Sequence, residues 1–257
     1  MGLGHSAFKV LSCLRNVSDA SQREISSKTG LSLGSVNSAV KELNESGLLF
    51  EGKITDAGYE ALHPYKVDNA IILAAGLSSR FAPISYEKPK GLLRVRGEVL
   101  IERQIEQLQD AGIKDITIVV GYKKEYFFYL ESKYGVSIVV NNEYASKNNH
   151  SSLYCVRNRL ANTYICSSDD YFTDNPFEPY VWHAYYAAQW SEGPTKEWCM
   201  KTGPHNRSWM SRLVASSPGI CSVTFISIGI SLRTCVLCLR MRMAGRKLPT
   251  SYGRTSS

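Results

Sequence analysis

A glycine-containing segment near residue 76 has the residue types needed to bind phosphate groups. Leu73-Ala-Ala-Gly-Leu-Ser-Ser-Arg80 continues a run of apolar residues, so we expect a buried strand that enters a tight turn of small residues. Backbone N–H groups in such a turn can face phosphate oxygens without interference from Cβ atoms. Arg80 adds a charge whose forked donors match phosphate oxygens. The segment therefore predicts a site for a nucleoside triphosphate.

A second cation follows ten residues later. Lys90 belongs to Lys88-Pro-Lys-Gly-Leu-Leu93, in which Pro89 stiffens the approach of the chain. One glycine loop alone would be weak evidence, because many junctions between a strand and a helix contain one. The loop, Arg80 and Lys90 at this spacing together indicate binding and charge neutralisation of a triphosphate.

Two adjacent carboxylates form the next candidate group. Asp169 and Asp170 follow the apolar residues Tyr164-Ile-Cys166, so we expect them at the carboxyl end of a buried strand, where open α/β sheets bind ligands. A carboxylate there suits Mg²⁺, a hard cation that keeps several waters and spans protein and phosphate oxygens. The alternative is that both carboxylates cap a surface turn.

A polar segment lies between these groups, from residue 141 to residue 153, and it includes Asn149 and Ser151. Side-chain amides can read the edge of a base, because they both donate and accept hydrogen bonds. Asparagines are also ordinary loop residues, so the segment alone does not settle a binding role. We expect His150 to be a loop or core residue and not a catalytic base.

These groups need a sheet to position them. Apolar runs predict strands at residues 70–75, 116–120, 136–140 and 164–166, and the amphipathic stretch 101–111 predicts a helix. Strands that alternate with helices favour an α/β fold with a mainly parallel sheet and helices on both faces.

The first 66 residues predict a separate small domain. Apolar spacing indicates a helix over residues 6–15, and Ser21 with Glu24 forms a capping box for a second helix that ends at Thr29-Gly30. A third helix is expected from Ser32 or Ser35 to Gly47. A hairpin over 48–55 and a helix over 56–62 follow, and residues 63–68 read as a linker.

This order of elements resembles a winged helix-turn-helix domain. The third helix has a polar face suited to phosphate and base-edge contacts, so the resemblance implies DNA as a partner through residues 1–66. The alternative is that the domain only packs against other parts or forms a homodimer.

Residues 73 to 93 resemble the LAAGxxxR…PKxLL signature of the sugar-phosphate nucleotidyltransferase superfamily, and more closely its CTP:phosphocholine cytidylyltransferase branch. The likeness extends over about residues 70–205. It implies a Rossmann-like sheet, Mg²⁺, and transfer of CMP from CTP to a small phosphorylated alcohol such as phosphocholine, with release of pyrophosphate. The commoner GxGxR form is replaced here by Leu77 and two serines, which leaves the base preference open.

The resemblance also implies residue roles. Lys90, Arg80 and Asp169 would be catalytic, and Asp169 would be the metal ligand, whereas Asp170 stands where a neutral polar residue is common. The residues that would bind the nucleotide are Leu73, Ala74, Ala75, Gly76, Ser78, Ser79, Arg80, Lys90, Asn149 and Ser151.

The basic charge of the chain is confined to its end. The net charge is +7, but residues 198–257 hold nine Lys or Arg and no Asp or Glu, so residues 1–197 carry 21 basic and 23 acidic side chains. The global charge is therefore no evidence for nucleic-acid binding. The seven cysteines show no paired metal spacing, and no run of about 18 apolar residues or leader pattern is present. We expect a cytoplasmic location and no membrane partner.

From about residue 207 the composition is abnormal for a folded enzyme, with ten serines and eight Lys or Arg in 51 residues. We expect three parts: a winged-helix domain at 1–66, a C-terminally incomplete nucleotidyltransferase domain at 67–206, and a disordered tail at 207–257. The hypothesis is a frameshift near Arg207, because a shifted frame can restore carboxylates and strand-like alternation. The competing account is a genuine basic tail that contacts nucleic acid.

Two further functions stay open. The chain could be a DNA-binding regulator whose second domain senses a nucleotide without turning it over, or a truncated product with impaired activity.

Overall fold

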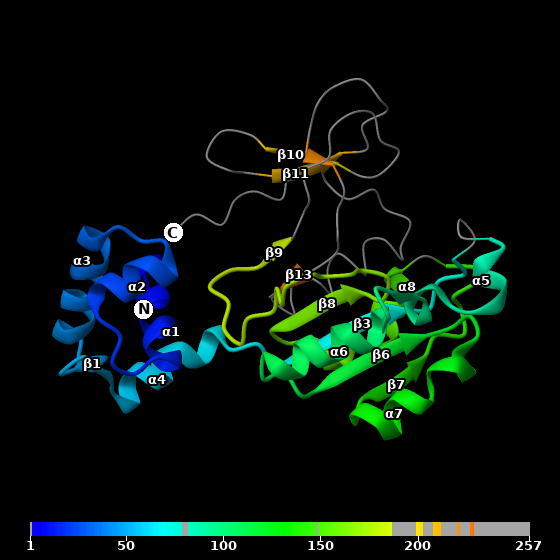
Figure 1. Ribbon diagram of the computed structural model, residues 1–257, viewed down its shortest axis with the longest axis horizontal. Helices are drawn as coiled ribbons and strands as arrows, with labels where there is room; N and C mark the ends of the chain where they lie inside the picture. Colours follow the sequence, from blue (N-terminus) through cyan, green and yellow to red (C-terminus); the bar gives the residue numbers. More distant parts are fainter. Residues whose placement is uncertain are drawn as a thin grey trace. The chain divides into compact units, whose positions relative to one another are not determined.

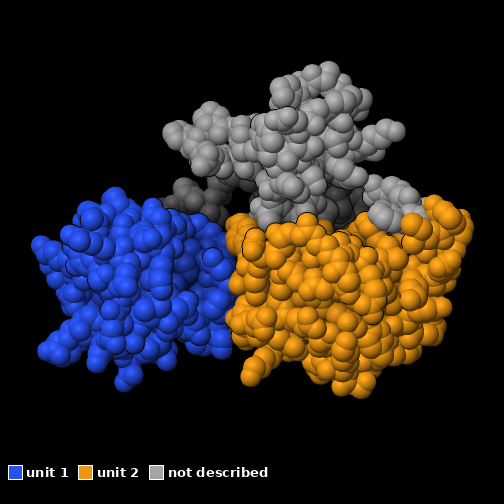
Figure 2. All heavy atoms as spheres, viewed as in Figure 1, with its two compact units in different colours: residues 1–66, 178–183 blue, residues 67–177, 184–257 orange. Residues whose placement is uncertain are grey.

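The computed structural model describes residues 2–78, 82–147 and 149–186, together with the short segments 199–202, 208–211, 220–221 and 227–228. The chain forms two compact units (Figure 2). Unit 1 comprises residues 1–66 and 178–183, and unit 2 comprises 67–177 and 184–257. No sequence signal assigned 178–183 to the first unit. The domain limits expected from sequence otherwise stay predictions.

Three helices form the body of unit 1 (Figure 1): α1 (His5–Asn16), α2 (Gln22–Thr29) and α3 (Leu33–Glu45). The capping box predicted for α2 is confirmed, because the Ser21 hydroxyl accepts from the Glu24 N–H at 3.3 Å and the Glu24 carboxylate accepts from the Ser21 N–H at 2.7 Å. Gly30 ends this helix with φ of +68°, a left-handed conformation that glycine adopts without steric strain. Of the two starts expected for α3, the structure has the first, with Ser32 as cap.

The rest of unit 1 is the wing and a closing helix. β1 (Leu49–Phe50) pairs antiparallel with β2 (Lys53–Ile54), and α4 (Asp56–Leu62) follows. The buried core joins all these elements through Leu11, Val36, Leu43, Leu49 and Leu62, among others.

The linker expected at 63–68 begins later than predicted. η1 (His63–Tyr65) is a turn of 3₁₀ helix, and the Tyr65 ring packs on Phe8 with centroids 5.1 Å apart. The Tyr65 hydroxyl accepts a hydrogen bond from the Leu3 N–H at 2.8 Å. Residues 63–65 therefore belong to the fold of unit 1, because an aromatic side chain anchors them.

Unit 2 is built on a sheet with the order β7-β6-β3-β8-β13-β9. The predicted parallel strands are confirmed as β3 (Asn69–Ala74), β6 (Ile116–Val120), β7 (Ser137–Val140) and β8 (Thr163–Ser167). β9 (Tyr185–Tyr186) and β13 (Ser227–Ile228) add antiparallel pairs at the β8 side. β3 and β6 are nearly continuously apolar, as strands buried on both faces must be.

Helices flank this Rossmann-like sheet. α6 (Leu100–Asp110) buries Ile101, Ile105 and Leu108, and Figure 1 shows it over one face of the sheet. α7 (Tyr129–Tyr134) precedes β7, and α8 (His150–Cys155) precedes β8. Ile71 and Ile165 pack with Val156 and Leu160, which follow α8.

Shorter elements complete the described part of the chain. Six of these short elements lie between β3 and β8 in the sequence: α5 (Ile84–Glu87), η3 (Lys90–Leu92), β4 (Arg94–Val95), β5 (Glu98–Val99), η4 (Lys124–Phe127) and η5 (Arg157–Arg159). A separate small sheet contains β10 (Cys199–Thr202), β11 (Ser208–Ser211) and β12 (Ile220–Cys221). Most of residues 207–257 lie outside the described residues, so the frameshift hypothesis stays a prediction.

Candidate active site

The predicted site residues follow two neighbouring parallel strands. Leu73 in β3 is the register partner of Ser167 in β8, and the Ser168 N–H donates to the Leu73 carbonyl at 3.1 Å. Parallel strands present their carboxyl ends at the same edge of the sheet. The loop after Leu73 and the loop containing Asp169 therefore begin side by side.

The loop after β3 leaves the sheet at Ala75. Ala75 is buried, and its carbonyl accepts from the Tyr122 N–H at 3.3 Å. Gly121 permits this approach, because a Cβ there would lie 2.8 Å from the Ala75 oxygen. Gly76 is exposed, and Ser78 adopts φ of +52°. Ser79 and Arg80 lie outside the described residues, so their predicted phosphate contacts stay predictions.

Lys90 and Asp169 are brought together. Lys90 begins η3, and its ammonium donates to the Asp169 carboxylate in a partly buried ion pair. Gly91 makes this possible, because an added Cβ would lie 2.8 Å from the Ser168 Cβ and Oγ. Such distances are shorter than van der Waals contact. The missing side chain at 91 thus allows the Lys90 turn to pack directly on the Asp169 loop.

The charge of Asp169 is stabilised locally. Burial favours the neutral acid, but hydrogen bonds from Lys90 and from the Ser167 hydroxyl outweigh it and hold the pKa of Asp169 below its usual value. Asp169 is therefore ionised at neutral pH, in the state that a metal ligand requires.

Asp170 has the opposite electrostatics. Its Oδ2 atom is buried and has no hydrogen-bond partner among the described residues. Burial, and then the negative charge of Asp169, raise the pKa of Asp170 to about 7. The pKa values of the two adjacent carboxylates thus differ, because hydrogen bonds from Lys90 and Ser167 lower that of Asp169, whereas burial and the charge of Asp169 raise that of Asp170.

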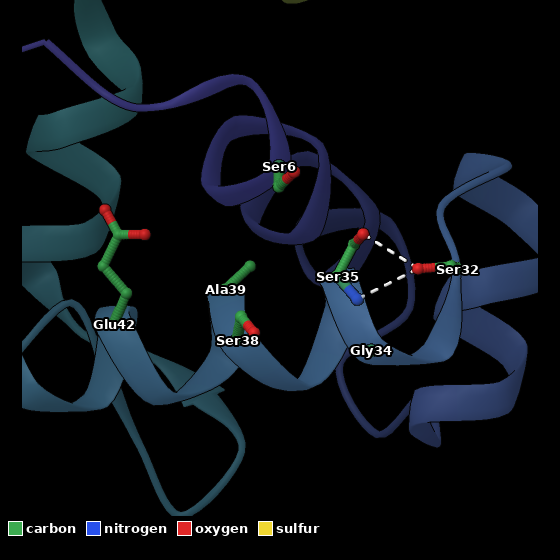
Figure 3. A pocket seen from close by; sticks show the side chains of 7 residues that line it. All are labelled: Ser6, Ser32, Gly34, Ser35, Ser38, Ala39 and Glu42. Carbon is green, nitrogen blue, oxygen red and sulfur yellow. Dashed lines mark hydrogen bonds between the residues drawn. The ribbon is translucent and has the colours of Figure 1, made fainter.

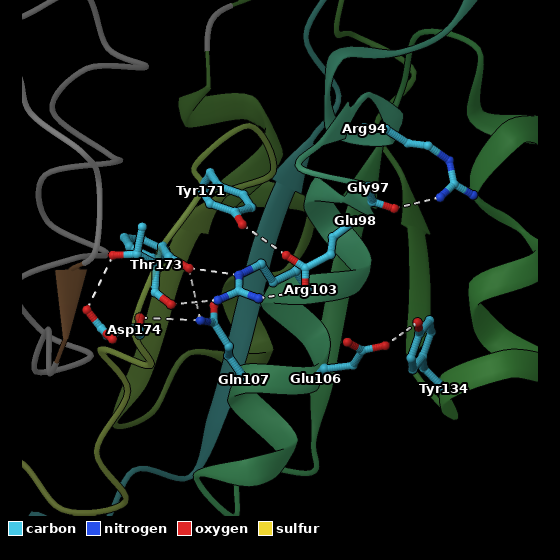
Figure 4. A network of polar contacts seen from close by, with 11 residues as sticks. Arg94, Gly97, Glu98, Arg103, Glu106, Gln107, Tyr134, Tyr171, Thr173 and Asp174 are labelled. Atoms are coloured by element: carbon cyan, nitrogen blue, oxygen red, sulfur yellow. Dashed lines mark hydrogen bonds and ion pairs between the residues drawn. The ribbon is translucent and has the colours of Figure 1, made fainter.

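Helix α6 holds the loop that carries both carboxylates. The Gln104 amide donates to the carbonyls of Ser167 at 2.7 Å and Asp170 at 3.2 Å. Further along (Figure 4), Arg103 donates to the carbonyls of Phe172 and Thr173, at 2.8 and 2.7 Å. The backbone on both sides of Asp169 is therefore fixed by one helix.

Four more hydrogen bonds extend this support. Glu98 accepts from Arg103 at 2.7 Å and from the Tyr171 hydroxyl at 2.9 Å. Gln107 donates to the Phe172 and Asp174 carbonyls at 3.2 and 3.3 Å. None of these positioning residues was identified from the sequence, because polar residues on an amphipathic helix carry no sign of a distant backbone partner.

The polar segment near 150 is ordered by a buried amide. Asn141 lies 1% exposed, and its amide nitrogen lies 2.9 Å from the Ser151 hydroxyl and 3.0 Å from that of Ser152. Ser151 is itself buried, whereas Asn149, at the start of α8, is exposed. Their expected contacts with a nucleotide stay predictions, and the geometry adds a structural role for Ser151.

The donor set at this edge fits Mg²⁺ in the mode it adopts with nucleotides. That mode uses one or two carboxylates, with phosphates and waters filling the other positions. Asp169 supplies an ionised carboxylate and Asp170 a buried oxygen that lacks a hydrogen-bond partner among the described residues. No cluster of three or more His, Cys, Asp or Glu is found among the described residues, so a dedicated protein cage for a metal is not seen there.

Comparison with known proteins identifies both units. Residues 70–193 match the model of the MobA-like NTP transferase domain, and residues 5–49 match that of the winged helix-turn-helix DNA-binding family. A solved structure of the CTP:phosphocholine cytidylyltransferase from Streptococcus pneumoniae superposes on this chain with a TM-score of 0.61. It is 36% identical over 69% of this chain and 78% of that chain. The chain belongs to the MobA-like nucleotidyltransferases.

The curated relatives include cytidylyltransferases. Choline-phosphate cytidylyltransferase of Streptococcus pneumoniae is 46% identical over 134 residues, which are 52% of this chain and 58% of the relative. 2-Aminoethylphosphonate cytidylyltransferase of Lancefieldella rimae is 42% identical over 51% of this chain and 54% of the relative. The chain thus spans little more than half the length of the curated relatives it matches.

The candidate site of this chain is therefore a pair of loops at the carboxyl ends of β3 and β8. The fold class expected from the sequence, a Rossmann-like sheet preceded by a winged helix-turn-helix domain, is confirmed. Among the described residues, no helix is long and apolar enough to cross a membrane.

Proposed function

We propose that unit 2 transfers CMP from CTP to a small molecule that carries a phosphate or phosphonate and an amino or quaternary ammonium group. The observation that carries this proposal is the ion pair between Lys90 and Asp169 beside the loop after β3. The two relatives, one a choline-phosphate and the other a 2-aminoethylphosphonate cytidylyltransferase, favour CTP and this class of acceptor.

The reaction is an in-line substitution at phosphorus. An oxygen of the acceptor attacks the α-phosphorus of CTP, the bond from that phosphorus to the bridging oxygen breaks, and pyrophosphate leaves. Catalysis of this kind depends on positioning and on stabilisation of negative charge. Asp169 would hold Mg²⁺, which would neutralise part of this charge when bound.

The residues of the chain have distinct roles in this proposal. Backbone N–H groups of residues 75–78 would face the phosphates, Lys90 would supply a cation near the α-phosphate, and Asp169 would hold the metal. The ion pair with Asp169 would hold Lys90 in place before substrates bind. Gln104 would act as a positioning residue, because it holds the backbone on both sides of Asp169.

The proposal is tested by pyrophosphate release. The full chain is incubated with Mg²⁺ and each of the four nucleoside triphosphates, against phosphocholine, 2-aminoethylphosphonate and glucose 1-phosphate. We expect release from CTP with an ammonium-bearing acceptor. A version of the chain with the reading frame restored after Arg207 is assayed in parallel, since the frameshift hypothesis predicts higher activity there. Absence of release from both proteins with every pair of substrates would refute the proposal.

A second candidate function is DNA binding by unit 1, with unit 2 sensing a nucleotide. Helix α3 presents Asn37, Ser38 and Lys41 to solvent, and a shallow polar hollow lies beside it (Figure 3). The residues that line the hollow are Ser6, Ser32, Gly34, Ser35, Ser38, Ala39 and Glu42. The serine hydroxyls of this hollow and the side-chain amide of Asn37 are groups that can contact phosphates and base edges.

The charge of this unit weakens the second candidate. Residues 1–66 hold seven Lys or Arg and seven Asp or Glu, a net charge of zero, and Lys41 pairs with Glu45 at 3.8 Å. Attraction to phosphates supplies most non-specific DNA binding. We therefore expect little retention of random duplex DNA at about 0.15 M salt. A Lys41→Ala variant that binds a selected duplex as tightly as the wild type would argue against α3 as the DNA-reading helix.

A further inference from the structure

Residues 178–183 lie in unit 1, although they follow the Asp169 loop in the sequence. The chain leaves unit 2 after Phe177, enters unit 1 at Glu178 and returns to unit 2 at Ala184. The six residues are Glu-Pro-Tyr-Val-Trp-His. The winged-helix unit is thus discontinuous, and six of its residues lie near the end of the segment that the nucleotidyltransferase family matches, residues 70–193.

Backbone pairing fixes the segment on unit 1. The Val181 N–H donates to the Tyr65 carbonyl at 2.8 Å, and Lys66 forms an antiparallel bridge with Tyr180. The indole N–H of Trp182 donates to the Leu3 carbonyl at 3.1 Å. The segment therefore connects to both ends of the first 66 residues.

Aromatic contacts add to this pairing. The Trp182 ring lies 4.6 Å from the His5 ring, and the Arg15 guanidinium lies 4.7 Å from the centre of the Tyr180 ring. Tyr180 and Trp182 both pack against the buried core of unit 1. Contacts of this kind, with rings at these separations, contribute beyond the area they bury.

The same stretch of chain is held at its other end by unit 2. Arg103, Gln104 and Gln107 of α6 bind backbone carbonyls between Ser167 and Asp174. Asn175 donates to the Gln107 carbonyl at 2.7 Å, and Phe177 packs edge-on to Tyr164 of β8 at 5.1 Å. Only the covalent step from Phe177 to Glu178 separates these contacts from those of unit 1.

We propose that unit 1 contains a docking face for the 178–183 segment of this same chain, and that docking couples the folded state of the helix-turn-helix to the order of the Asp169 loop. The face consists of Leu3, His5, Arg15 and Tyr65. A segment anchored at both ends transmits a loss of order at one end to the other, and such coupling is reciprocal. A loss of order in the Asp169 loop is therefore expected to lower the stability of unit 1, which contains α3.

Amide hydrogen exchange of the full chain, without any ligand, tests this proposal. Trp182→Ala should raise the exchange rates in residues 5–16 by at least about tenfold and should also raise them in residues 171–175, while those of β3 and β6 change less than about twofold. Gln104→Ala should raise exchange in 171–175 and, reciprocally, in 178–183. Tyr59→Ala is the matched control, because Tyr59 belongs to unit 1 and is 51% exposed.

The outcomes separate the two parts of the proposal. If Trp182→Ala leaves the exchange of residues 5–16 unchanged, the segment does not support unit 1 and the proposal is overturned. If residues 5–16 respond but residues 171–175 do not, the coupling is overturned. Trp182→Phe keeps an aromatic ring and loses the bond to Leu3, so an intermediate response is expected even if the alanine variant fails to fold. Because no nucleotide is used, failure here leaves the proposed transferase activity untouched.

Discussion

Lys90 and Asp169 are 79 residues apart in the sequence and form an ion pair at the carboxyl edge of the sheet. Each residue was identified from its own short motif, and the fold brings the two motifs into contact. The pairing holds Lys90 beside the Asp169 loop. It also explains why the pKa of Asp169 is lowered in spite of burial.

Lys90→Ala should abolish most of the proposed transferase activity. Removal of a cation that stabilises charge in a phosphoryl-transfer transition state lowers the rate by about 10²–10³-fold or more. The fold should survive, because the ion pair is partly exposed to solvent. Turnover is measured as pyrophosphate release, and thermal unfolding is followed in the same preparation.

The matched control is Lys114→Ala. Lys114 is exposed and precedes β6 at the amino edge of the sheet, so its loss should leave turnover within about twofold of the wild type. Near-normal turnover of Lys90→Ala would show that Lys90 has no catalytic role.

Gly91→Ala should separate Lys90 from Asp169 without removing either residue. The added Cβ would lie 2.8 Å from Ser168 side-chain atoms and 3.0 Å from the Ser168 carbonyl oxygen. Overpacking of this kind costs about 1–3 kcal/mol of unfolding free energy. We expect a shift of the η3 turn and a large loss of kcat, measured beside denaturant unfolding.

A double variant distinguishes the steric cause from a general loss of structure. Gly91→Ala combined with Ser168→Gly removes the nearer side-chain atoms, and part of both activity and stability should return. If the double variant is no better than Gly91→Ala, the contact with Ser168 is not the cause of the defect.

The elements of the fold could be predicted because their signals are local. Ser21 and Glu24 lie three residues apart and cap α2, and the apolar run at 116–120 is a strand with those limits. The order of strands and helices then favours a parallel sheet, which places Asp169 near residue 73.

The supports of the site could not be predicted in the same way. Gln104 donates to the carbonyl of Ser167, which is 63 residues away in the sequence. In the sequence, Gln104 looks like any other polar residue of an amphipathic helix. The contact of Gly91 with Ser168 depends on the arrangement of two turns. The packing of residues 178–183 on unit 1 could not be predicted either, because aromatic residues such as Tyr180 and Trp182 could pack in the core of either unit.

Ser21→Ala should destabilise unit 1 by about 1 kcal/mol, the usual loss for a helix cap. The variant loses the bond from the Glu24 N–H to the hydroxyl. Ser27→Ala is the control, because Ser27 is exposed within α2 and has little effect on helix ends. Exchange rates in residues 22–29 report the difference, and equal rates in the two variants would contradict a role for the cap.

Asp170→Asn should change how stability depends on pH. The folded-state pKa of Asp170 is about 7, above its ordinary value of 3.8, so the folded protein binds this proton more tightly than the unfolded chain. The contribution of Asp170 to the free energy of unfolding therefore falls as pH rises from about 4 to about 7. Asparagine cannot ionise, so the variant should gain stability over the wild type across this range, with a constant gain above about pH 7.

Urea unfolding of both proteins at a series of pH values, in the presence of a chelator, measures this difference. Thr173→Ala is a useful control, because it lies in the same loop and removes no ionisable group. Its stability relative to the wild type should be independent of pH. A pH-independent difference for Asp170→Asn would mean that Asp170 titrates at its ordinary pKa in the folded protein, and that its carboxylate is solvated.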